Sequence, residues 1–543
     1  MNDTVLSIQC LSVALPEGAD RRLAVDDVSL DLRKGETVCI VGESGSGKSI
    51  TAFSVVGLLS PQLVPVAGKV LFGGNDLLKA PAAEMRRIRG ARIAMIFQEP
   101  MTALNPVLRC GQQIMEMFEA HGLHTHRARR ARAIELLTEV GLPDPAKAFS
   151  AFPHELSGGQ RQRVMIAMAL ALEPDVIIAD EPTTALDVTT QAQILSLLKR
   201  LRENHGTAIL FITHDFGVVA EIADRVAVMH RGKVVESGPT VDVLNDPQEA
   251  YTRDLLAAVP ALTPPAPAGK PDAEIVLSGL NLNKTYRGRS FFNRRDVPAL
   301  TDVSFDLYRG ETLGIVGESG SGKSTLGRCL MRLADLDAGE IIVDGKDLHA
   351  LSERAFQPMR KTMQMVFQDP FASLNPQRTV GRIIADGPIV HGKAESLALA
   401  QAEELLSFVG LDPSSMNRYP REFSGGQRQR IGIARALALE PKIIIADEPV
   451  SALDVSVQAQ VLKLLRGLKV RLSLSMIFIT HDLRVAAQIC DRVAVMQRGR
   501  IIEMGPTAEI FSNPKSEYTR ALLAAIPGQG LGAKQAFESE LPA

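Results

Sequence analysis

One eight-residue segment, Gly-Glu-Ser-Gly-Ser-Gly-Lys-Ser, occurs twice in this chain, at 42–49 and again at 317–324. It fits the pattern G-x-x-x-x-G-K-[S/T], a glycine-rich loop whose backbone N–H groups converge on phosphate oxygens. Each copy follows a short apolar run of strand type and precedes a segment with helical apolar spacing. The helix N-terminus in that arrangement adds a positive dipole end beside the phosphates. The repeat therefore predicts two α/β units that each bind a nucleotide through its phosphates.

The residues of each loop have separate expected roles. Lys48 and Lys323 would reach the β- and γ-phosphates, and the hydroxyls of Ser49 and Ser324 would ligate Mg²⁺. The remaining positions at which we expect nucleotide contacts are Gly42, Ser44, Gly45 and Gly47 in the first loop and Gly317, Ser319, Gly320 and Gly322 in the second.

The chain as a whole has the make-up of a water-soluble protein with more than one domain. Its 543 residues are enough for two full cores, and only 22% of them are charged, with a formal net charge of −2. This balance argues against a nucleic-acid partner held by broad phosphate neutralisation. We expect a cytoplasmic chain, because no apolar run is long enough to span a membrane and the N-terminus lacks a signal-peptide pattern. The five cysteines show no C-x-x-C spacing, and we expect them to be free thiols.

The two halves match well beyond their loops. Four further motifs recur in the same order, which indicates that both copies retain one chemistry. They are Phe-Gln-[Glu/Asp]-Pro at 97–100 and 367–370, Ser-Gly-Gly-Gln at 157–160 and 424–427, Asp-Glu-Pro at 180–182 and 447–449, and Thr-His-Asp at 213–215 and 480–482.

Four segments follow from this alignment: a first domain at 1–259, a linker rich in Pro and Ala at 260–273, a second domain at 274–527 and a disordered tail at 528–543. Inserts at 106–153 and 376–420 carry helix-spaced apolar residues. Continuous apolar runs at 176–179, 209–212 and 226–229 predict strands of a parallel sheet covered on both faces. We interpret the basic run at 127–132 as a solvated helix face.

In each half, an Asp-Glu pair stands at the end of one apolar run. Asp180 and Asp447 would hold Mg²⁺ through water at the sheet edge, near the glycine-rich loop. Glu181 and Glu448 would then be placed to polarise an attacking water as general bases.

The Ser-Gly-Gly-Gln segments open apparent helices at 160–172 and 427–439. Their hydroxyls, N–H groups and helix dipoles would face an anion, although Ser-Gly-Gly also caps ordinary helices.

Taken together, these motifs make both halves resemble the nucleotide-binding domains of ATP-binding cassette (ABC) proteins, over about 5–259 and 275–526. The resemblance implies an α/β fold of two tandem P-loop NTPase domains, each with a RecA-like core, an antiparallel β subdomain and a helical subdomain. It implies ATP and Mg²⁺ as cofactors. It assigns His214 and His481 to orienting the γ-phosphate and water, and Gln98 and Gln368 to Mg²⁺ or the attacking water and to sensing nucleotide for a membrane partner.

The resemblance also implies that the two halves pair head to tail. The γ-phosphate held by one half would then meet Ser157 and Gly159, or Ser424 and Gly426, of the other half. Asp187 and Asp454 would cross that interface. An aromatic residue that stacks on adenine is expected at Tyr286, whereas the corresponding residue of the first half is Leu15, so unequal affinities at the two sites are a hypothesis.

Two features resemble the dipeptide, oligopeptide and nickel importer branch of the family. They are the [Glu/Asp]-Pro-x-x-x-Leu-Asn-Pro segments at 99–106 and 369–376, and the Tyr-Thr-Arg-x-Leu-Leu segments at 251–256 and 518–523. This branch implies an ATPase peripheral to the cytoplasmic face of the inner membrane, serving two permease subunits and an extracytoplasmic solute-binding protein. Short or glutathione-like peptides are the expected cargo; nickel or another small solute is an alternative. A second alternative is a soluble cassette protein that acts on ribosomes. Such proteins carry a long charged linker, which this chain lacks. No nucleic-acid partner is expected. No iron–sulfur cluster is expected, since no cysteine-rich segment follows Leu256.

Overall fold

The computed structural model describes residues 3–184, 186–264, 274–287, 296–369, 373–451 and 453–528. The chain divides into two compact units, with Met1–Val259 in the first and Pro260–Ile526 in the second. Most of the expected linker (265–273) and nearly all of the expected tail (529–543) lie outside the described residues.

The first unit begins with a four-stranded sheet in the order β2-β1-β4-β5, whose paired strands are all antiparallel. Residues of β2 alternate between buried and exposed because one face of the sheet packs on the core and the other meets water. The strands are β1 (Thr4–Ala14), β2 (Leu23–Arg33), β4 (Val64–Phe72) and β5 (Asn75–Asp76).

The second sheet of the unit has six strands in the order β10-β9-β3-β8-β7-β6. Four of its five strand pairings are parallel, as the apolar runs predict, but the edge strand β10 runs antiparallel to β9. A tight turn makes this possible, because Arg231 (φ 48°) and Gly232 (φ 91°) both take left-handed conformations. The strands are β3 (Thr37–Val41), β6 (Ile93–Ile96), β7 (Val176–Asp180), β8 (Ala208–Thr213), β9 (Arg225–His230) and β10 (Lys233–Pro239).

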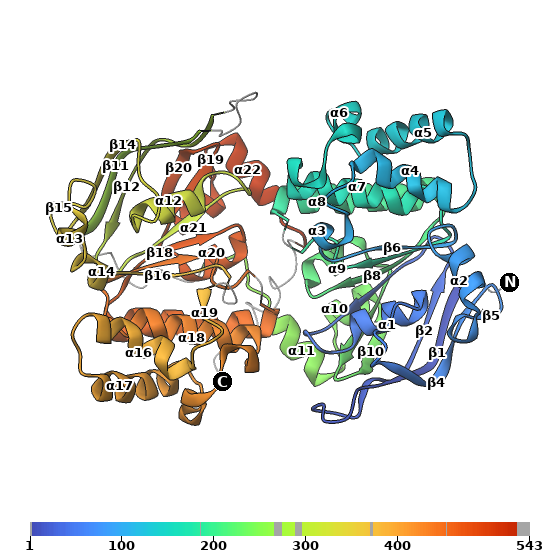
Figure 1. Ribbon diagram of the computed structural model, residues 1–543, viewed down its shortest axis with the longest axis horizontal. Helices are drawn as coiled ribbons and strands as arrows, with labels where there is room; N and C mark the ends of the chain where they lie inside the picture. Colours follow the sequence, from blue (N-terminus) through green and yellow to red (C-terminus); the bar gives the residue numbers. More distant parts are fainter. Residues whose placement is uncertain are drawn as a thin grey trace. The chain divides into compact units, whose positions relative to one another are not determined.

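The insert at 106–153 is helical, as expected, and its helices α4 to α6 gather beside α7 in Figure 1. Helix α7 begins two residues earlier than the sequence suggests, because Ser157 caps it directly. The helices are α1 (Lys48–Val56), α2 (Ala82–Ile88), α3 (Pro100–Ala103), α4 (Cys110–Ala120), α5 (His126–Glu139), α6 (Pro145–Ser150), α7 (Gly158–Leu170), α8 (Val188–His205), α9 (Phe216–Ile222), α10 (Thr240–Asn245) and α11 (Ala250–Ala257).

The second unit repeats this plan with sheets β12-β11-β14-β15 and β16-β17-β18-β13-β19-β20. Its strands are β11 (Ile275–Tyr286), β12 (Val297–Tyr308), β13 (Thr312–Val316), β14 (Ala338–Val343), β15 (Lys346–Asp347), β16 (Met363–Val366), β17 (Ile443–Asp447), β18 (Ser475–Thr480), β19 (Arg492–Gln497) and β20 (Arg500–Pro506).

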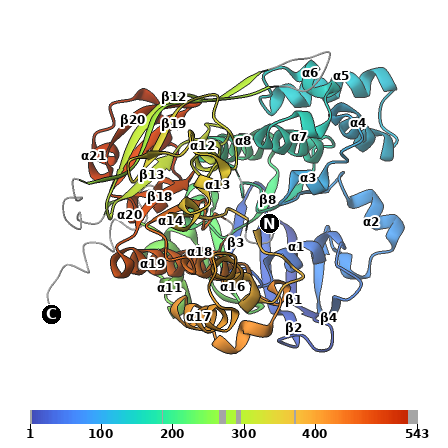
Figure 2. The same cartoon turned by 60° about the vertical axis from the view of Figure 1, so that its left-hand side comes forward.

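Helices α16 and α17 of this unit pack on α18, as Figure 2 shows. The helices are α12 (Lys323–Leu330), α13 (Glu353–Phe356), α14 (Met359–Thr362), α16 (Val380–Val390), α17 (Glu395–Phe408), α18 (Gly425–Leu437), α19 (Val455–Leu472), α20 (Leu483–Ile489), α21 (Thr507–Ser512) and α22 (Glu517–Ala524).

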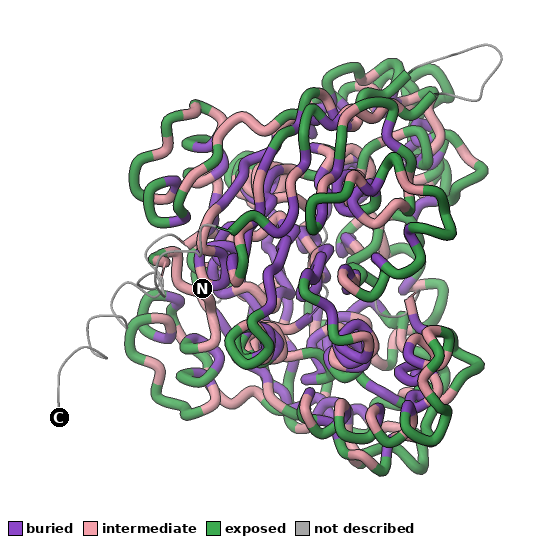
Figure 3. The backbone as a smooth tube through the Cα atoms, turned by 90° about the vertical axis from the view of Figure 1, so that its left-hand side faces the viewer, coloured by how far each residue is buried: buried purple, intermediate pink, exposed green. Residues whose placement is uncertain are grey.

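The mainly parallel sheets are buried on both faces, which Figure 3 shows as buried runs inside a mostly exposed outer layer. In β3 the alternate residues Cys39 and Val41 join one hydrophobic cluster, while Val38 and Ile40 join another on the opposite face. Two apolar faces explain why such strands read as continuous apolar runs in the sequence. By contrast, Arg127 and Arg130 of α5 are exposed, in keeping with a solvated face.

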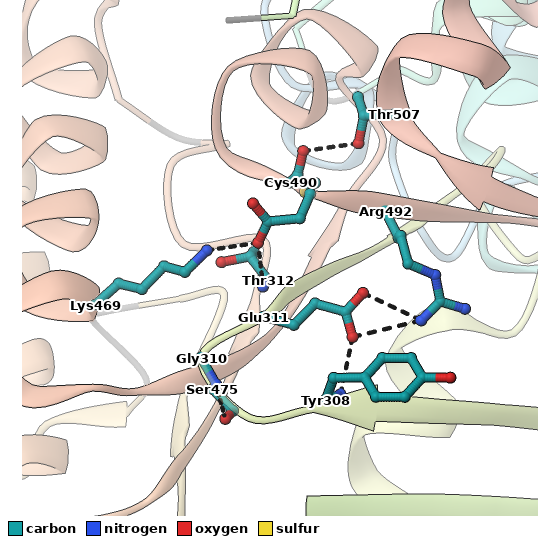
Figure 4. Close-up of polar contacts among 10 residues, drawn as sticks. Tyr308, Gly310, Glu311, Thr312, Lys469, Ser475, Cys490, Arg492 and Thr507 are labelled. Atoms are coloured by element: carbon teal, nitrogen blue, oxygen red, sulfur yellow. Dashed lines mark hydrogen bonds and ion pairs between the residues drawn. The ribbon is translucent and has the colours of Figure 1, made fainter. Parts of the chain in front are cut away.

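A buried ion pair holds the start of β13 (Figure 4). The carboxylate of Glu311, only 1% exposed, accepts hydrogen bonds from the Arg492 guanidinium (3.1 Å) and from the backbone N–H of Tyr308 (2.8 Å). Burial nevertheless raises the pKa of Glu311. The first unit has the equivalent pair Glu36 and Arg225. These pairs lie at the opposite end of the strand from the glycine-rich loop and so anchor the strand that carries it.

Candidate nucleotide-binding site

Each glycine-rich loop joins the end of a buried strand, β3 or β13, to the first residue of a helix, α1 or α12. At its first glycine, the backbone of the loop packs directly against the backbone of the neighbouring strand. A Cβ atom at Gly42 would lie 2.2 Å from the Met229 carbonyl oxygen, and one at Gly317 would lie 2.2 Å from that of Met496. The loop therefore requires glycine at its first position because the neighbouring strand approaches too closely for any side chain. The middle of each loop, at Ser44 and Gly45 and at Ser319 and Gly320, is exposed.

The side chain of each loop lysine folds back onto the backbone of its own loop. The Lys48 ammonium donates to the carbonyl oxygens of Gly42 (2.7 Å) and Glu43 (2.9 Å), and only 5% of the residue is exposed. Lys323 makes the same two bonds, to Gly317 (2.8 Å) and Glu318 (2.7 Å). Both lysines thus lie against the backbone of their loops, at the N-terminus of the following helix, where anionic groups are stabilised.

The residues expected to hold Mg²⁺ meet in both units. The hydroxyl of Ser49 donates to Oδ1 of Asp180 (2.9 Å), and Ser324 donates to Oδ1 of Asp447 (3.0 Å). Burial raises the pKa of the Asp180 carboxyl to about 6 and also raises that of Asp447. Hydroxyl and carboxylate oxygens are the hard ligands that Mg²⁺ prefers, so this pair of side chains fits the ion.

Three motifs far apart in the sequence converge on Glu181. Its Oε2 accepts from the Gln98 amide (3.0 Å) and from the Thr184 hydroxyl (2.9 Å), and it lies 3.3 Å from Nδ1 of His214. Burial alone would raise the pKa of this carboxyl, but the hydrogen bond and charge of His214 and the charge of Lys48 outweigh it, so the pKa is lowered. The glutamate therefore stays ionised, as a general base must.

The second unit repeats this cluster. The Glu448 carboxylate accepts from Gln368 (2.9 Å) and lies 3.1 Å from Nδ1 of His481, and its pKa is lowered for the same reasons. Burial would lower the pKa of His481, but the hydrogen bond to Glu448 outweighs burial and raises it. Both glutamates also adopt left-handed backbone conformations, Glu181 at φ 44° and Glu448 at φ 45°. Such strained conformations in non-glycine residues concentrate at functional sites.

The Ser-Gly-Gly-Gln segments cap helices. Ser157 Oγ accepts from the backbone N–H of Gln160 (3.3 Å), whose side chain accepts in turn from the Ser157 N–H (3.0 Å); Ser424 and Gln427 form the same box. The capping interpretation is thus correct for the isolated units, and it also places each serine at the positive end of a 13-residue helix.

The second glycines of these segments have a packing role that the sequence did not reveal. A Cβ atom at Gly159 would lie 2.5 Å from the Thr190 methyl group, and one at Gly426 would lie 2.2 Å from a methyl of Val457. Glycine at these positions therefore lets α7 and α18 approach α8 and α19 closely.

Leu15 and Tyr286 occupy equivalent places. The strand bulges at Cys10 (φ 49°) and Asn281 (φ 50°), each five residues earlier, mark the same point in β1 and β11. Tyr286 is 43% exposed, with the Lys284 ammonium 5.6 Å above its ring centre, whereas Leu15 is half-buried.

In the first unit the guanidinium of Arg21 also donates to the carbonyl oxygen of Gly45 in the loop. Sequence reasoning missed Arg21, which belongs to no repeated motif. It also missed Thr184, although Ser451 stands at the same place in the second half and contacts Glu448.

Comparison with known proteins identifies the family of the chain. A family model described as "ABC transporter" matches residues 25–184 and 300–451. A second, described as "Oligopeptide/dipeptide transporter, C-terminal region", matches 235–297 and 502–541.

Two relatives match almost the whole chain. The peptidoglycan transport ATP-binding protein YejF of Agrobacterium fabrum is 51% identical over 528 residues, covering 96% of each chain. The glutathione import ATP-binding protein GsiA of Salmonella choleraesuis is 48% identical over 557 residues, covering 96% of this chain and 89% of that one. Among the residues that the structure describes, none of the helices is both long and apolar enough to cross a membrane. The chain belongs to the ABC transporter family, with two ATP-binding cassettes in tandem and an oligopeptide/dipeptide transporter C-terminal region after each.

Proposed function

We propose that this transport ATPase energises the uptake of short peptides, such as dipeptides, oligopeptides or glutathione-like peptides. The observation that carries the proposal is the oligopeptide/dipeptide transporter C-terminal region in both halves. Relatives named for glutathione import and peptidoglycan transport support the same cargo class. In this proposal the protein is peripheral to the cytoplasmic face of the inner membrane. Two permease subunits and an extracytoplasmic solute-binding protein complete the importer.

The proposed chemistry uses the same set of side chains in each unit. Lys48 and the backbone of its loop bind the ATP phosphates. Ser49 and Asp180 would hold Mg²⁺, which neutralises phosphate charge when bound. Glu181 takes the proton of the attacking water, and its carboxylate is kept ionised by its contacts with His214. Lys323, Ser324, Asp447, Glu448 and His481 act in the same way in the second unit.

The two units would complete each other's sites head to tail. Ser157 and Gly159 would meet the γ-phosphate bound at Lys323, and Ser424 and Gly426 the one bound at Lys48. The exposed positive helix ends behind the two serines support this pairing. ATP would favour the closed pair and hydrolysis would release it. Because each state has its own affinity for the permeases, the cycle can bias transport.

A mainly apolar pocket in the first unit, whose lining includes one charged residue, Arg89, is the place where we propose that a permease docks. Its volume is about 200 Å³, and four methionines, Met95, Met117, Met165 and Met168, line it together with Phe97. Flexible methionine side chains adapt to an inserted apolar group. Phe97 immediately precedes Gln98, whose amide contacts Glu181. An apolar side chain from a permease would therefore contact the segment that leads to the catalytic glutamate.

The corresponding place in the second unit is different. Arg435 stands at the position of Met168 in the helix that follows the signature serine. Its guanidinium donates to the carbonyl oxygen of Ser373 and lies 5.7 Å from the centre of the Phe367 ring. The first unit has methionine at this position, and its charged lining residue is Arg89 instead.

Uptake of labelled dipeptides, tetrapeptides and glutathione by cells whose only copy of the chain is wild type or Glu181→Gln/Glu448→Gln tests the cargo. We expect the double variant to lose uptake, because the amide cannot take a proton from water. A control chain with two exposed glutamates changed, Glu203→Gln/Glu404→Gln, should transport normally. If the catalytic variant is expressed, binds ATP and still imports peptides at the wild-type rate, the peptide assignment is wrong, and nickel uptake is the next assay.

A further inference from the structure

The Tyr-Thr-Arg segments near the end of each unit reach back to the nucleotide loop. The Tyr251 hydroxyl in α11 accepts from the backbone N–H of Glu43 (3.4 Å) and donates to the carboxylate of the same residue (3.3 Å). In the second unit the Tyr518 hydroxyl of α22 accepts from the backbone N–H of Glu318 (3.2 Å). The same contact occurs in both units, although each tyrosine is 200 or more residues from its partner in the sequence.

The peptide group that each tyrosine contacts also holds the loop lysine. The Glu43 N–H and the Gly42 carbonyl belong to one peptide unit; Tyr251 accepts from the N–H, and the Lys48 ammonium donates to the carbonyl (2.7 Å). In the second unit, Tyr518 and Lys323 hold the peptide between Gly317 and Glu318 in the same way. Since a peptide group is planar, fixing its N–H also fixes the direction of its C=O. The tyrosine thus sets the orientation of an acceptor of the phosphate-binding lysine.

The helix that carries each tyrosine is itself firmly anchored. In the first unit, Glu236 of β10 accepts from the backbone N–H of Gln248 (2.7 Å), just before α11. The Arg253 guanidinium donates to the Pro247 (3.0 Å) and Gln248 (2.9 Å) carbonyl oxygens, and Thr252 is fully buried.

In the second unit, Glu503 of β20 and Arg520 of α22 make the same contacts with Lys515 and Pro514. Each residue of the Tyr-Thr-Arg segment therefore has a physical role. The arginine ties the helix to the segment that precedes it, the threonine is buried beneath the helix, and the tyrosine extends to the loop.

We propose that Tyr251 and Tyr518 are positioning residues for ATP binding, each fixing the peptide that orients the loop lysine of its own cassette. The proposal rests on the ATP-binding role of the cassettes and not on the identity of the transported solute. It gives the C-terminal helices, which lie outside the two segments matched by the "ABC transporter" model, a part in forming the nucleotide site.

The first unit adds a ring contact. The imidazole of His230 stacks on the Tyr251 ring, with centres 3.9 Å apart and planes at 17°. Gln497 ends the corresponding strand of the second unit. His230→Gln therefore gives the first unit the residue of the second and removes the stacking while leaving the tyrosine hydroxyl in place.

The test is ATP hydrolysis by the purified full-length chain carrying Tyr251→Phe/Tyr518→Phe. Phenylalanine removes the hydroxyls but keeps the rings and their packing. Each change removes the hydrogen bond to the loop N–H, and in the first unit also the bond that the Tyr251 hydroxyl donates to the Glu43 carboxylate. The loss should raise the KM for ATP by about three- to ten-fold. The kcat and the melting temperature measured without nucleotide should stay at wild-type values. As a matched control, Tyr308→Phe removes a hydroxyl at the opposite end of β13, and it should leave KM unchanged.

A second measurement isolates one loop. In a chain carrying Lys323→Ala, binding of a fluorescent ATP analogue reports mainly on the first loop, and there Tyr251→Phe should weaken binding more than His230→Gln does. The proposal is overturned if KM and analogue affinity match the unsubstituted chain. It is also overturned if KM, kcat and melting temperature all change together, because the tyrosines would then act only in packing. None of these results depends on transport, so they neither support nor contradict the proposal that peptides are the cargo.

Discussion

Exchanging the residues at positions 15 and 286 tests whether the two nucleotide sites differ in affinity for ATP. Tyr286→Leu gives the second unit the residue of the first, and Leu15→Tyr makes the reverse change. The two positions are equivalent in the fold, since the same strand bulge precedes each. If Tyr286 stacks on adenine, the first change should weaken ATP binding at the second loop, and the second change should strengthen binding at the first.

The size of the effect follows from the surroundings of the ring. Stacking of a base on an aromatic side chain contributes about 1–3 kcal/mol when measured against alanine. Leucine keeps part of the apolar contact, and the Tyr286 ring is 43% exposed, so the lower half of that range applies. A loss of about 1–2 kcal/mol corresponds to a dissociation constant higher by about 5- to 30-fold.

Equilibrium titration with ATP, in chains that keep one functional loop, measures each site separately. Lys48→Ala leaves the second loop and Lys323→Ala leaves the first. The unsubstituted second site should bind more tightly than the first, and Tyr286→Leu should remove the difference. Equal dissociation constants for the two unsubstituted sites, or no change on Tyr286→Leu, would refute the reasoning, because the ring would then not contact the base.

Two further predictions concern the partner and the pH dependence. Met168→Arg should reduce co-purification of the permease subunits by about ten-fold, because it adds a second guanidinium, besides that of Arg89, to a mainly apolar pocket. Val241→Arg, at a position 70% exposed, should have no such effect, and equal effects of the two changes would argue against docking in the pocket. The Glu311 carboxyl faces Arg492 and Asp491, and burial raises its pKa above the ordinary 4.5. Between the pKa of Glu311 in the unfolded chain and its higher pKa in the folded chain, the folded chain binds more protons than the unfolded one. The stability that this carboxyl contributes therefore falls as pH rises through that window. The difference in unfolding midpoint between wild type and Glu311→Gln, measured between about pH 4 and pH 8, should change across the window, and a constant difference would contradict the assignment.

Local sequence features predicted the larger part of the fold. A strand buried on both faces must be apolar throughout, so β7, β8 and β9 were visible as continuous apolar runs. The glycine-rich loop needs small residues next to a helix start, which explains why 42–49 and 317–324 could be located to the residue. The boundaries were less certain. Helix α7 begins at Gly158 rather than at 160, because a cap depends on the backbone angles of Ser157.

The antiparallel edge strand β10 was not expected. Its direction depends on the left-handed turn at Arg231 and Gly232, and the apolar pattern of the sequence carries no information on strand direction.

The sequence by itself determined that two ATP-binding cassettes follow each other in this chain, because the motifs repeat in order and each motif is local. It also indicated which carboxylates and lysines take part. Only the tertiary structure decided how they are held: that Gln98 and His214 both contact one oxygen of Glu181, and that Tyr251 reaches Glu43 from the far end of the unit. These contacts join residues that no spacing rule relates, since their distances are set by how sheets and helices pack. Hydrogen bonds of this kind exist only once the whole unit has folded.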